Sequence, residues 1–209
     1  KKGFEKTMIA EELKKSLYAS GAALVGFADM RNVPSSPLPY GVCVALPVPV
    51  NIVREIEEGP TLAYWYTYQD LNARLDSIIT DGAEFLKSLN YSAIPITTGY
   101  VRQDEQRRTP LPYKTVATRA GMGWIGKSCL LVTPEYGSAI RISVLLTDAP
   151  LDCGTPVSES KCGSCELCKT HCPAQALTGT LWSAGTDREE ILETETCVDV
   201  IRKRMKERT

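Results

Sequence analysis

The sequence lacks a long hydrophobic run, an excess of one charge and a secretion signal. Its most apolar stretch, residues 42–53, is interrupted by Pro47 and Pro49 and falls short of the roughly 18 residues of a membrane-spanning helix. The 24 Lys and Arg nearly balance the 25 Asp and Glu, so no overall field attracts nucleic acid or an anionic membrane. No signal peptide is recognisable. We therefore expect a cytoplasmic protein with no membrane partner.

Histidine is almost absent, and the cysteines do not have the even distribution of a secreted disulfide scaffold. His171 is the only histidine, and its place inside a cysteine run suggests a surface residue that tunes a site and is not a ligand. Four of the eight cysteines lie within residues 162–172, and Cys43, Cys129, Cys153 and Cys197 are scattered. This distribution favours a reducing compartment. The first residue is Lys1 and not Met, so we expect that the N-terminus has been trimmed.

The cysteine run reads CGSCELCKTHCP from residue 162 to residue 173. Three thiols separated by two residues each can wrap one corner of a cubane, and a fourth followed by proline is typical of bacterial ferredoxins. A zinc site and a disulfide pair are the alternatives. Zinc ligand pairs are usually a dozen or more residues apart, and here the third cysteine comes too soon. The run therefore predicts an iron–sulfur cubane with Cys162, Cys165 and Cys168 as ligands. Cys172 leaves this loop, and in two-cluster ferredoxins the cysteine at that place ligates the other cluster.

Hydrophobic periodicity predicts an α/β body followed by a small cysteine-rich module. We expect a domain at 1–151 that binds a cofactor or substrate, and a ferredoxin-like iron–sulfur domain at 152–209, which is incomplete if a second cysteine run is missing. The aromatic group at residues 64–68 either lines the pocket of a flat cofactor or packs at the core and its rim. The expected helices are 7–20, 63–90, 113–120, 188–192 and 196–208; the expected strands are 23–28, 42–46 and 91–97, with a hairpin joining 129–133 to 139–146.

A glycine-rich stretch at residues 119–128, RAGMGWIGKS, matches both a dinucleotide-binding and a P-loop pattern. Either motif needs a strand before the glycines and a helix after them. The sequence predicts the reverse order, which disfavours a nucleotide. The glycines could still let a ligand approach the backbone, with Lys127 donating to an anionic group. The alternative is a tight helix-to-strand turn with an exposed lysine.

Residues 120–128, 134–138 and 146–151, followed by the cysteine run, resemble the epoxyqueuosine reductase family, cobalamin-dependent iron–sulfur proteins related to reductive dehalogenases. The resemblance implies a nitroreductase-like cobalamin-binding body that receives electrons from a 4Fe-4S module. It also implies a cofactor site and a cluster site. The expected cofactor-binding residues are Gly121, Gly123, Trp124, Gly126, Lys127 and Ser138, and the expected cluster ligands are Cys162, Cys165, Cys168, Cys172 and Cys197.

The chain departs from the family pattern at the proton donor. When the family's Asp-x-x-Pro segment is aligned on Pro110, Arg107 occupies the position of the acid, and Tyr113-Lys114 replaces a Glu-Arg pair. An arginine stays protonated and cannot act as a general acid near neutral pH. We therefore expect an oxidoreductase whose substrate is not epoxyqueuosine, with its catalytic residues unassigned. The alternative is a non-catalytic electron-transfer protein.

The number of clusters and the partners stay open. For a single cluster, Cys172 or Cys197 supplies the fourth ligand; if a second cysteine run exists outside this sequence, both belong to a second cluster. Cys197 could also be an ordinary buried thiol on the helical face that it shares with Ile201 and Met205. Cobalamin is a possible further cofactor. A redox partner protein or a small-molecule substrate is expected, and a tRNA would require a local basic patch.

Overall fold

The computed structural model describes residues 2–57 and 59–208, which divide into two compact units. The first unit comprises Lys1–Met122 and Ala139–Val157, and the second comprises Gly123–Ser138 and Ser158–Thr209. The expected assignment of residues 1–151 and 152–209 to a cofactor domain and a cluster domain stays a prediction. None of the described helices is long and apolar enough to cross a membrane.

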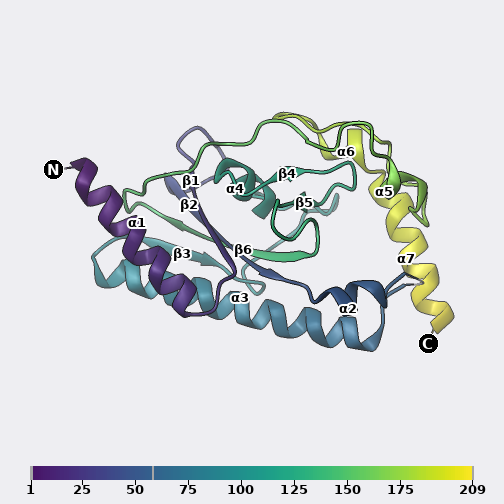
Figure 1. The fold of residues 1–209 in the computed structure, drawn as a ribbon, viewed down its shortest axis with the longest axis horizontal. Coiled ribbons are helices and arrows are strands. Elements are labelled where there is room, and N and C mark those ends of the chain that lie inside the picture. Colours follow the sequence, from purple (N-terminus) through teal and green to yellow (C-terminus); the bar gives the residue numbers. More distant parts are fainter. Residues whose placement is uncertain (1, 58, 209) are drawn as a thin grey trace. The chain divides into compact units, whose positions relative to one another are not determined.

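The first unit is built on a four-stranded antiparallel sheet (Figure 1). The strands are β1 (Leu24–Asp29), β2 (Tyr40–Pro47), β3 (Ala93–Ile96) and β6 (Ile140–Thr147), in the order β1-β2-β6-β3. Strand β2 is central and almost wholly buried, and it pairs with β6 over its full length, from Tyr40 opposite Thr147 to Pro47 opposite Ile140. The sequence pattern of β2 is accordingly a continuous apolar run.

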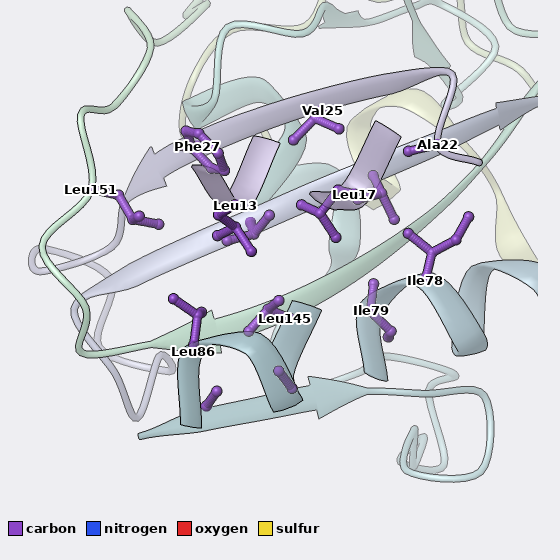
Figure 2. Close-up of a cluster of buried hydrophobic side chains, with 14 of the residues drawn as sticks. Leu13, Leu17, Ala22, Val25, Phe27, Ile78, Ile79, Leu86, Leu145 and Leu151 are labelled. Carbon is purple, nitrogen blue, oxygen red and sulfur yellow. The ribbon is translucent and has the colours of Figure 1, made fainter. Parts of the chain in front are cut away.

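Two long helices, α1 (Lys2–Ala19) and α3 (Leu62–Ser88), bury their apolar faces against the sheet. Helix α3 begins where the Thr61 side chain accepts a hydrogen bond from the Tyr64 amide, which satisfies a donor at the helix start. Figure 2 shows Leu13 and Leu17 of α1 gathered with Ile78, Ile79 and Leu86 of α3 and with residues of the strands. Fully burying each such side chain stabilises the fold by roughly 1.5–3 kcal/mol.

The helix α4 (Tyr113–Arg119) packs on β1, β2 and β6 on the opposite side of the sheet from this core. Alternation along β2 sends Val42 and Val44 into the core with α1 and α3, so Gly41 faces the other side. A Cβ added at Gly41 would lie 2.6 Å from a Val116 methyl of α4, which explains why a glycine stands there. A short helix, α2 (Val50–Arg54), follows β2.

The second unit is small and is built mostly from turns. It contains a two-stranded antiparallel ribbon of β4 (Trp124–Ile125) and β5 (Leu131–Val132) and the helices α5 (Leu167–Thr170), α6 (Arg188–Ile191) and α7 (Thr194–Arg208). Helix α6 begins with a capping box, in which the Asp187 amide donates to the Glu190 carboxylate at 2.9 Å. Few of its residues are buried, so bound metal is one way such a module gains stability.

Most of the expected elements are confirmed with shifted ends, but the expected hairpin is wrong. Helix α1 begins at Lys2, before the expected start at residue 7, and the ends of α3 and α4 lie within a residue or two of the expected positions. Strand β5 pairs with β4, whereas β6 pairs with β2 and β3. The physical reason is that β6 has eight residues and finds longer partners in the sheet than the two-residue β5 can offer.

Candidate functional site

The cysteine run forms a tight loop of free thiols. Gly163 adopts a left-handed backbone at φ 54°, and the Cys165 amide donates to the Cys162 carbonyl at 3.1 Å, which closes the first turn. The short helix α5 then carries Cys168, and its end places Cys172, whose amide donates to the Lys169 carbonyl at 3.2 Å. All eight cysteines are free, so the disulfide alternative finds no support.

The thiols of the second unit influence one another in two groups. Burial raises the pKa of the Cys168 thiol, and negative charge on Cys162 and Cys165 raises it further. Burial likewise raises the pKa of Cys197, and charge on Cys172 adds to it. Charge on Cys162 and Cys165 thus acts on Cys168, and charge on Cys172 acts on Cys197. The second pair comprises the two cysteines between which the assignment of a fourth ligand stays open.

These sulfurs do not yet form a ligand set. Among the described residues, no group of three or more His, Cys, Asp or Glu side chains is arranged to hold a metal ion. The five expected cluster ligands stay a prediction.

The glycines of the turn are explained by packing of the chain on itself. A Cβ added at Gly121 would lie 2.7 Å from the Thr155 carbonyl oxygen, and Gly121 also has a positive φ of 77°. A Cβ at Gly123 would lie 2.1 Å from the Val132 carbonyl oxygen. Both positions exclude a side chain because the backbone of another segment passes there. At Gly121 and Gly123, the group that comes close to the glycine is thus a backbone carbonyl of this protein.

The same turn lies against the first cysteine of the run. A Cβ at Gly126 would be 3.6 Å from the Cys162 sulfur. Burial acts to raise the pKa of Cys162, but hydrogen bonds from the Ser160 hydroxyl and the Lys127 amide, and the nearby Trp124 indole, outweigh it and lower the pKa. The Trp124 Nε1 is buried, and no acceptor among the described residues lies within hydrogen-bond geometry of it.

Lys127 is buried, contrary to the alternative that it is an exposed lysine on a tight turn. Its side chain is 6% exposed, and its Nζ lies 3.9 Å from Oε1 of Glu166, inside the cysteine loop. At this distance the two groups form an ion pair but not a hydrogen bond. The turn does run from a helix, α4, into strands β4 and β5, as expected, and this order confirms that neither nucleotide motif has its structural context.

The expected cofactor residues are divided between the two units. Gly121 belongs to the first unit, whereas Gly123, Trp124, Gly126, Lys127 and Ser138 belong to the second. Ser138 is exposed. Cofactor binding by this set stays a prediction.

The aromatic group lies on the rim of the first unit and not in its core. Trp65 and Tyr66 are 53% and 69% exposed. Trp65 stacks on Tyr68 with ring centroids 6.0 Å apart, and the Arg141 guanidinium lies 4.2 Å from the centroid of the Tyr68 ring. Asn72 accepts hydrogen bonds from Arg141 and so fixes this arrangement.

An open groove of about 550 Å³ lies beside this aromatic group, between the end of β2 and the start of α3. Sequence reasoning missed it, because its walls come from segments about 20 residues apart. Its lining residues are Leu46, Pro47, Pro49, Tyr66, Thr67, Asp70, Leu71 and Arg74.

The segment that departs from the family's proton donor is a compact loop before α4. Arg107 has a positive φ of 59°, and its amide donates to the Asp104 carbonyl at 3.0 Å. The Asp104 carboxylate accepts from the Arg108 amide at 2.8 Å. Tyr113 donates its hydroxyl to the Ile96 carbonyl, and burial raises its pKa to about 12. Tyr113 is thus held as a neutral phenol that braces α4 against β3.

Two cysteines outside the run behave as structural residues. Cys43 is fully buried in β2, and burial raises the pKa of its thiol to about 12. Cys153 is half-buried, and burial together with the charge of Asp29 raises its pKa to about 11. Neither thiol has the lowered pKa of a reactive nucleophile.

The chain has a fold that also occurs in solved structures of reductive dehalogenases and epoxyqueuosine reductases. A reductive dehalogenase, whose structure is described as suggesting a mechanism for B12-dependent dehalogenation, superposes with a TM-score of 0.72 at 18% identity, over 93% of this chain and 29% of that one. An epoxyqueuosine reductase solved with a modified tRNA-Tyr stem loop superposes with a TM-score of 0.59 at 21% identity, over 91% of this chain and 56% of that one. Identities this low establish a shared fold only.

Sequence comparison then gives the particular relatives. The epoxyqueuosine reductase of Listeria monocytogenes is 48% identical over 64 residues, which are 31% of this chain and 17% of the relative. That of Synechococcus sp. strain CC9605 is 46% identical over 69 residues, 33% of this chain and 21% of the relative. No protein-family model matches the chain. The resemblance to epoxyqueuosine reductases is therefore confirmed, over a region that spans about a fifth of those proteins or less.

Proposed function

We propose that this chain is an iron–sulfur oxidoreductase in which the second unit holds a ferredoxin-like 4Fe-4S site and supplies electrons to a cofactor on the α/β body. The observation that carries the proposal is the loop of free thiols, whose first turn is closed by the Cys165 amide donating to the Cys162 carbonyl at 3.1 Å. The turn that packs on the Cys162 sulfur also carries Trp124, whose Nε1 has no hydrogen-bond partner among the described residues. A thiolate-ligated iron–sulfur cluster fits these residues, because the thiols can ligate iron and the sulfur atoms of a cluster accept hydrogen bonds from donors such as the Trp124 indole.

The protein residues have separable roles in this proposal. Cys162, Cys165 and Cys168 hold three irons of one cluster. Cys172 and Cys197, which influence one another, either provide its fourth ligand or belong together to a second cluster. When bound, the cluster supplies single-electron transfer, and the protein sets its potential through charge, hydrogen bonds and solvent exposure.

A corrinoid is the proposed electron acceptor, by analogy with the B12-dependent dehalogenase that shares the fold. The substrate is proposed to be something other than epoxyqueuosine, because Arg107 stands where the family's acid is expected and a guanidinium does not release a proton near neutral pH. A tRNA partner is a weaker proposal. An epoxyqueuosine reductase with this fold was solved with a tRNA stem loop, which favours a tRNA partner. The net charge of −1 does not favour it, because a tRNA is a polyanion and binds to positively charged surfaces.

A second candidate, a non-catalytic electron carrier, is favoured by the same replacement at Arg107. The two are distinguished by loading the purified chain with cobalamin under anaerobic conditions and recording its visible spectrum. Retention of corrinoid bands after gel filtration supports the enzyme. Iron and sulfide without retained corrinoid support the carrier.

The ligand assignment is tested by replacing single cysteines and measuring iron after anaerobic reconstitution. Cys168→Ser should lose most of the bound iron, because it removes one of the ligands. Cys153→Ser is the matched control, since that half-buried thiol lies in the first unit, and it should retain iron at the level of the unmodified chain. Equal iron in both variants would contradict the proposed site.

A further inference from the structure

The turn of residues 123–128 carries two polar groups whose positions its own contacts do not explain. The first is Trp124 Nε1, which is buried without a hydrogen-bond partner among the described residues. Leaving a buried donor unsatisfied costs roughly 1–3 kcal/mol, so such a group in a folded protein calls for an acceptor. Trp124 itself pairs with Val132 in the two-stranded ribbon of β4 and β5.

The second group is the Lys127 ammonium, on a side chain that is only 6% exposed. A buried lysine is normally paired and hydrogen-bonded. Here the nearest carboxylate oxygen is that of Glu166 at 3.9 Å, and Glu166 is itself 51% exposed. The Lys127 side chain is therefore buried in the second unit, and its ammonium pairs with a half-exposed carboxylate of the cysteine loop.

Both groups lie beside the cysteine loop. A Cβ added at the intervening Gly126 would lie 3.6 Å from the Cys162 sulfur, and the Nζ of Lys161, the residue before Cys162, lies 5.7 Å from the centroid of the Trp124 ring. Glu166, the partner of Lys127, lies between Cys165 and Cys168 in the loop. One short turn thus brings an indole donor and an ammonium to the cysteine loop.

We propose that this turn is the electrostatic support of an iron–sulfur cluster, with Trp124 Nε1 donating a hydrogen bond to a sulfur at the Cys162 corner and Lys127 compensating the negative charge. The inference rests on the proposed function and deepens it. It assigns Trp124 and Lys127 to the cluster as positioning and tuning residues, in place of the cofactor contacts expected from the sequence. Hydrogen bonds and positive charge next to a cluster both stabilise its reduced, more negative state.

The test uses the full chain, reconstituted anaerobically with ferrous iron and sulfide, and measures the midpoint potential of the cluster by redox titration followed by EPR. Trp124→Phe keeps an aromatic ring and removes the donor. At a fixed potential, Trp124→Phe should raise the ratio of oxidised to reduced cluster roughly tenfold. For a one-electron couple this corresponds to a midpoint potential lower by about 59 mV. Lys127→Gln should shift the ratio in the same direction.

Each variant has a matched control in the same unit. Trp182→Phe makes the same chemical change at a half-buried tryptophan that follows the loop, and Lys169→Gln removes the same charge from an exposed side chain between Cys168 and Cys172. Lys169→Gln should change the ratio by less than about twofold, because exposed charges are screened by solvent. Trp182→Phe should also change it by less than about twofold, because it removes no donor that the proposal places at the cluster. Equal potentials for Trp124→Phe and Trp182→Phe at full iron content would overturn the inference and leave the proposed function standing.

A second measurement covers the case in which a variant fails to fold. Pulsed EPR of the reduced, unmodified chain with ¹⁵N-labelled indole should show a coupled nitrogen that persists in Trp182→Phe. Absence of any such coupling would overturn the inference without any variant at Trp124. A chain that takes up no iron at all would contradict the proposed function and the inference together.

Discussion

Replacing Gly123 by alanine tests whether the glycine turn exists to pack the chain on itself. The added Cβ would lie 2.1 Å from the Val132 carbonyl oxygen and 2.9 Å from its carbon. Ordinary contacts at a Cβ are 3.4 Å or more. A backbone carbonyl in the β4–β5 ribbon cannot rotate away as a side chain can, so the strands must separate. Overpacking costs typically 1–3 kcal/mol, and we expect Gly123→Ala to cost about 3 kcal/mol.

Gly126→Ala is the matched control, three residues along the same turn. There the nearest atom to the added Cβ is a Val132 methyl at 2.9 Å, which can move with its side chain, so we expect a cost of about 1 kcal/mol. At roughly 2–4 °C per kcal/mol for a protein of this size, Gly123→Ala should lower Tm by about 6–12 °C and Gly126→Ala by about 2–4 °C.

The assay is thermal unfolding followed by tryptophan fluorescence in a Trp65→Phe background. The two remaining tryptophans, Trp124 and Trp182, both lie in the second unit, so the signal reports that unit alone. Equal Tm values for Gly123→Ala and Gly126→Ala would refute the packing explanation. Glycine at both positions would then be explained by the close approach of a ligand to the backbone.

Three further predictions follow from the first unit. Burial raises the pKa of Cys43 to about 12, so mass spectrometry should find it unmodified after iodoacetamide treatment of the native chain at pH 8, and modified after unfolding. The Arg31 side chain hydrogen-bonds to Asp29 and lowers the pKa of that carboxyl from 3.8 to about 2. The pair therefore contributes stability above the pKa that Asp29 has in the unfolded chain, and this contribution is lost as the pH falls toward 2. Arg31→Ala should return the pKa of Asp29 to near 3.8 in an NMR titration. Leu145→Ala opens a cavity in the core between the sheet and the two long helices and should lower the free energy of unfolding by about 2–5 kcal/mol in a urea titration, whereas a loss below about 1 kcal/mol would contradict the packing described.

The sequence predicts the first unit well where one element carries its own pattern. Helix α3 repeats apolar residues at helical spacing, from Leu71 and Leu75 to Leu86, and these are the residues that the core buries. The hairpin prediction failed because β4 and β5 have two residues each, too few for a period, and because the partners of β6 lie far away in the sequence.

The candidate site was predictable only in its chemistry. The spacing of the cysteines indicates what they can bind, since ligand spacing is local. The burial of Lys127 was not predictable, because it depends on Glu166, which lies 39 residues later, and a lysine in a glycine turn is usually solvated. The unsatisfied Trp124 Nε1 is likewise a property of the fold, since no sequence pattern marks a donor without an acceptor.

The most direct test of the account is metal and sulfide analysis of the anaerobically purified chain, combined with low-temperature EPR of the dithionite-reduced sample. We predict about four iron and four sulfide per bound cluster and the fast-relaxing signal of a reduced 4Fe-4S centre. Stoichiometric zinc, or a chain that binds neither iron nor sulfide while its thiols stay reduced, would contradict the central claim that the loop of residues 162–172 holds an iron–sulfur cluster.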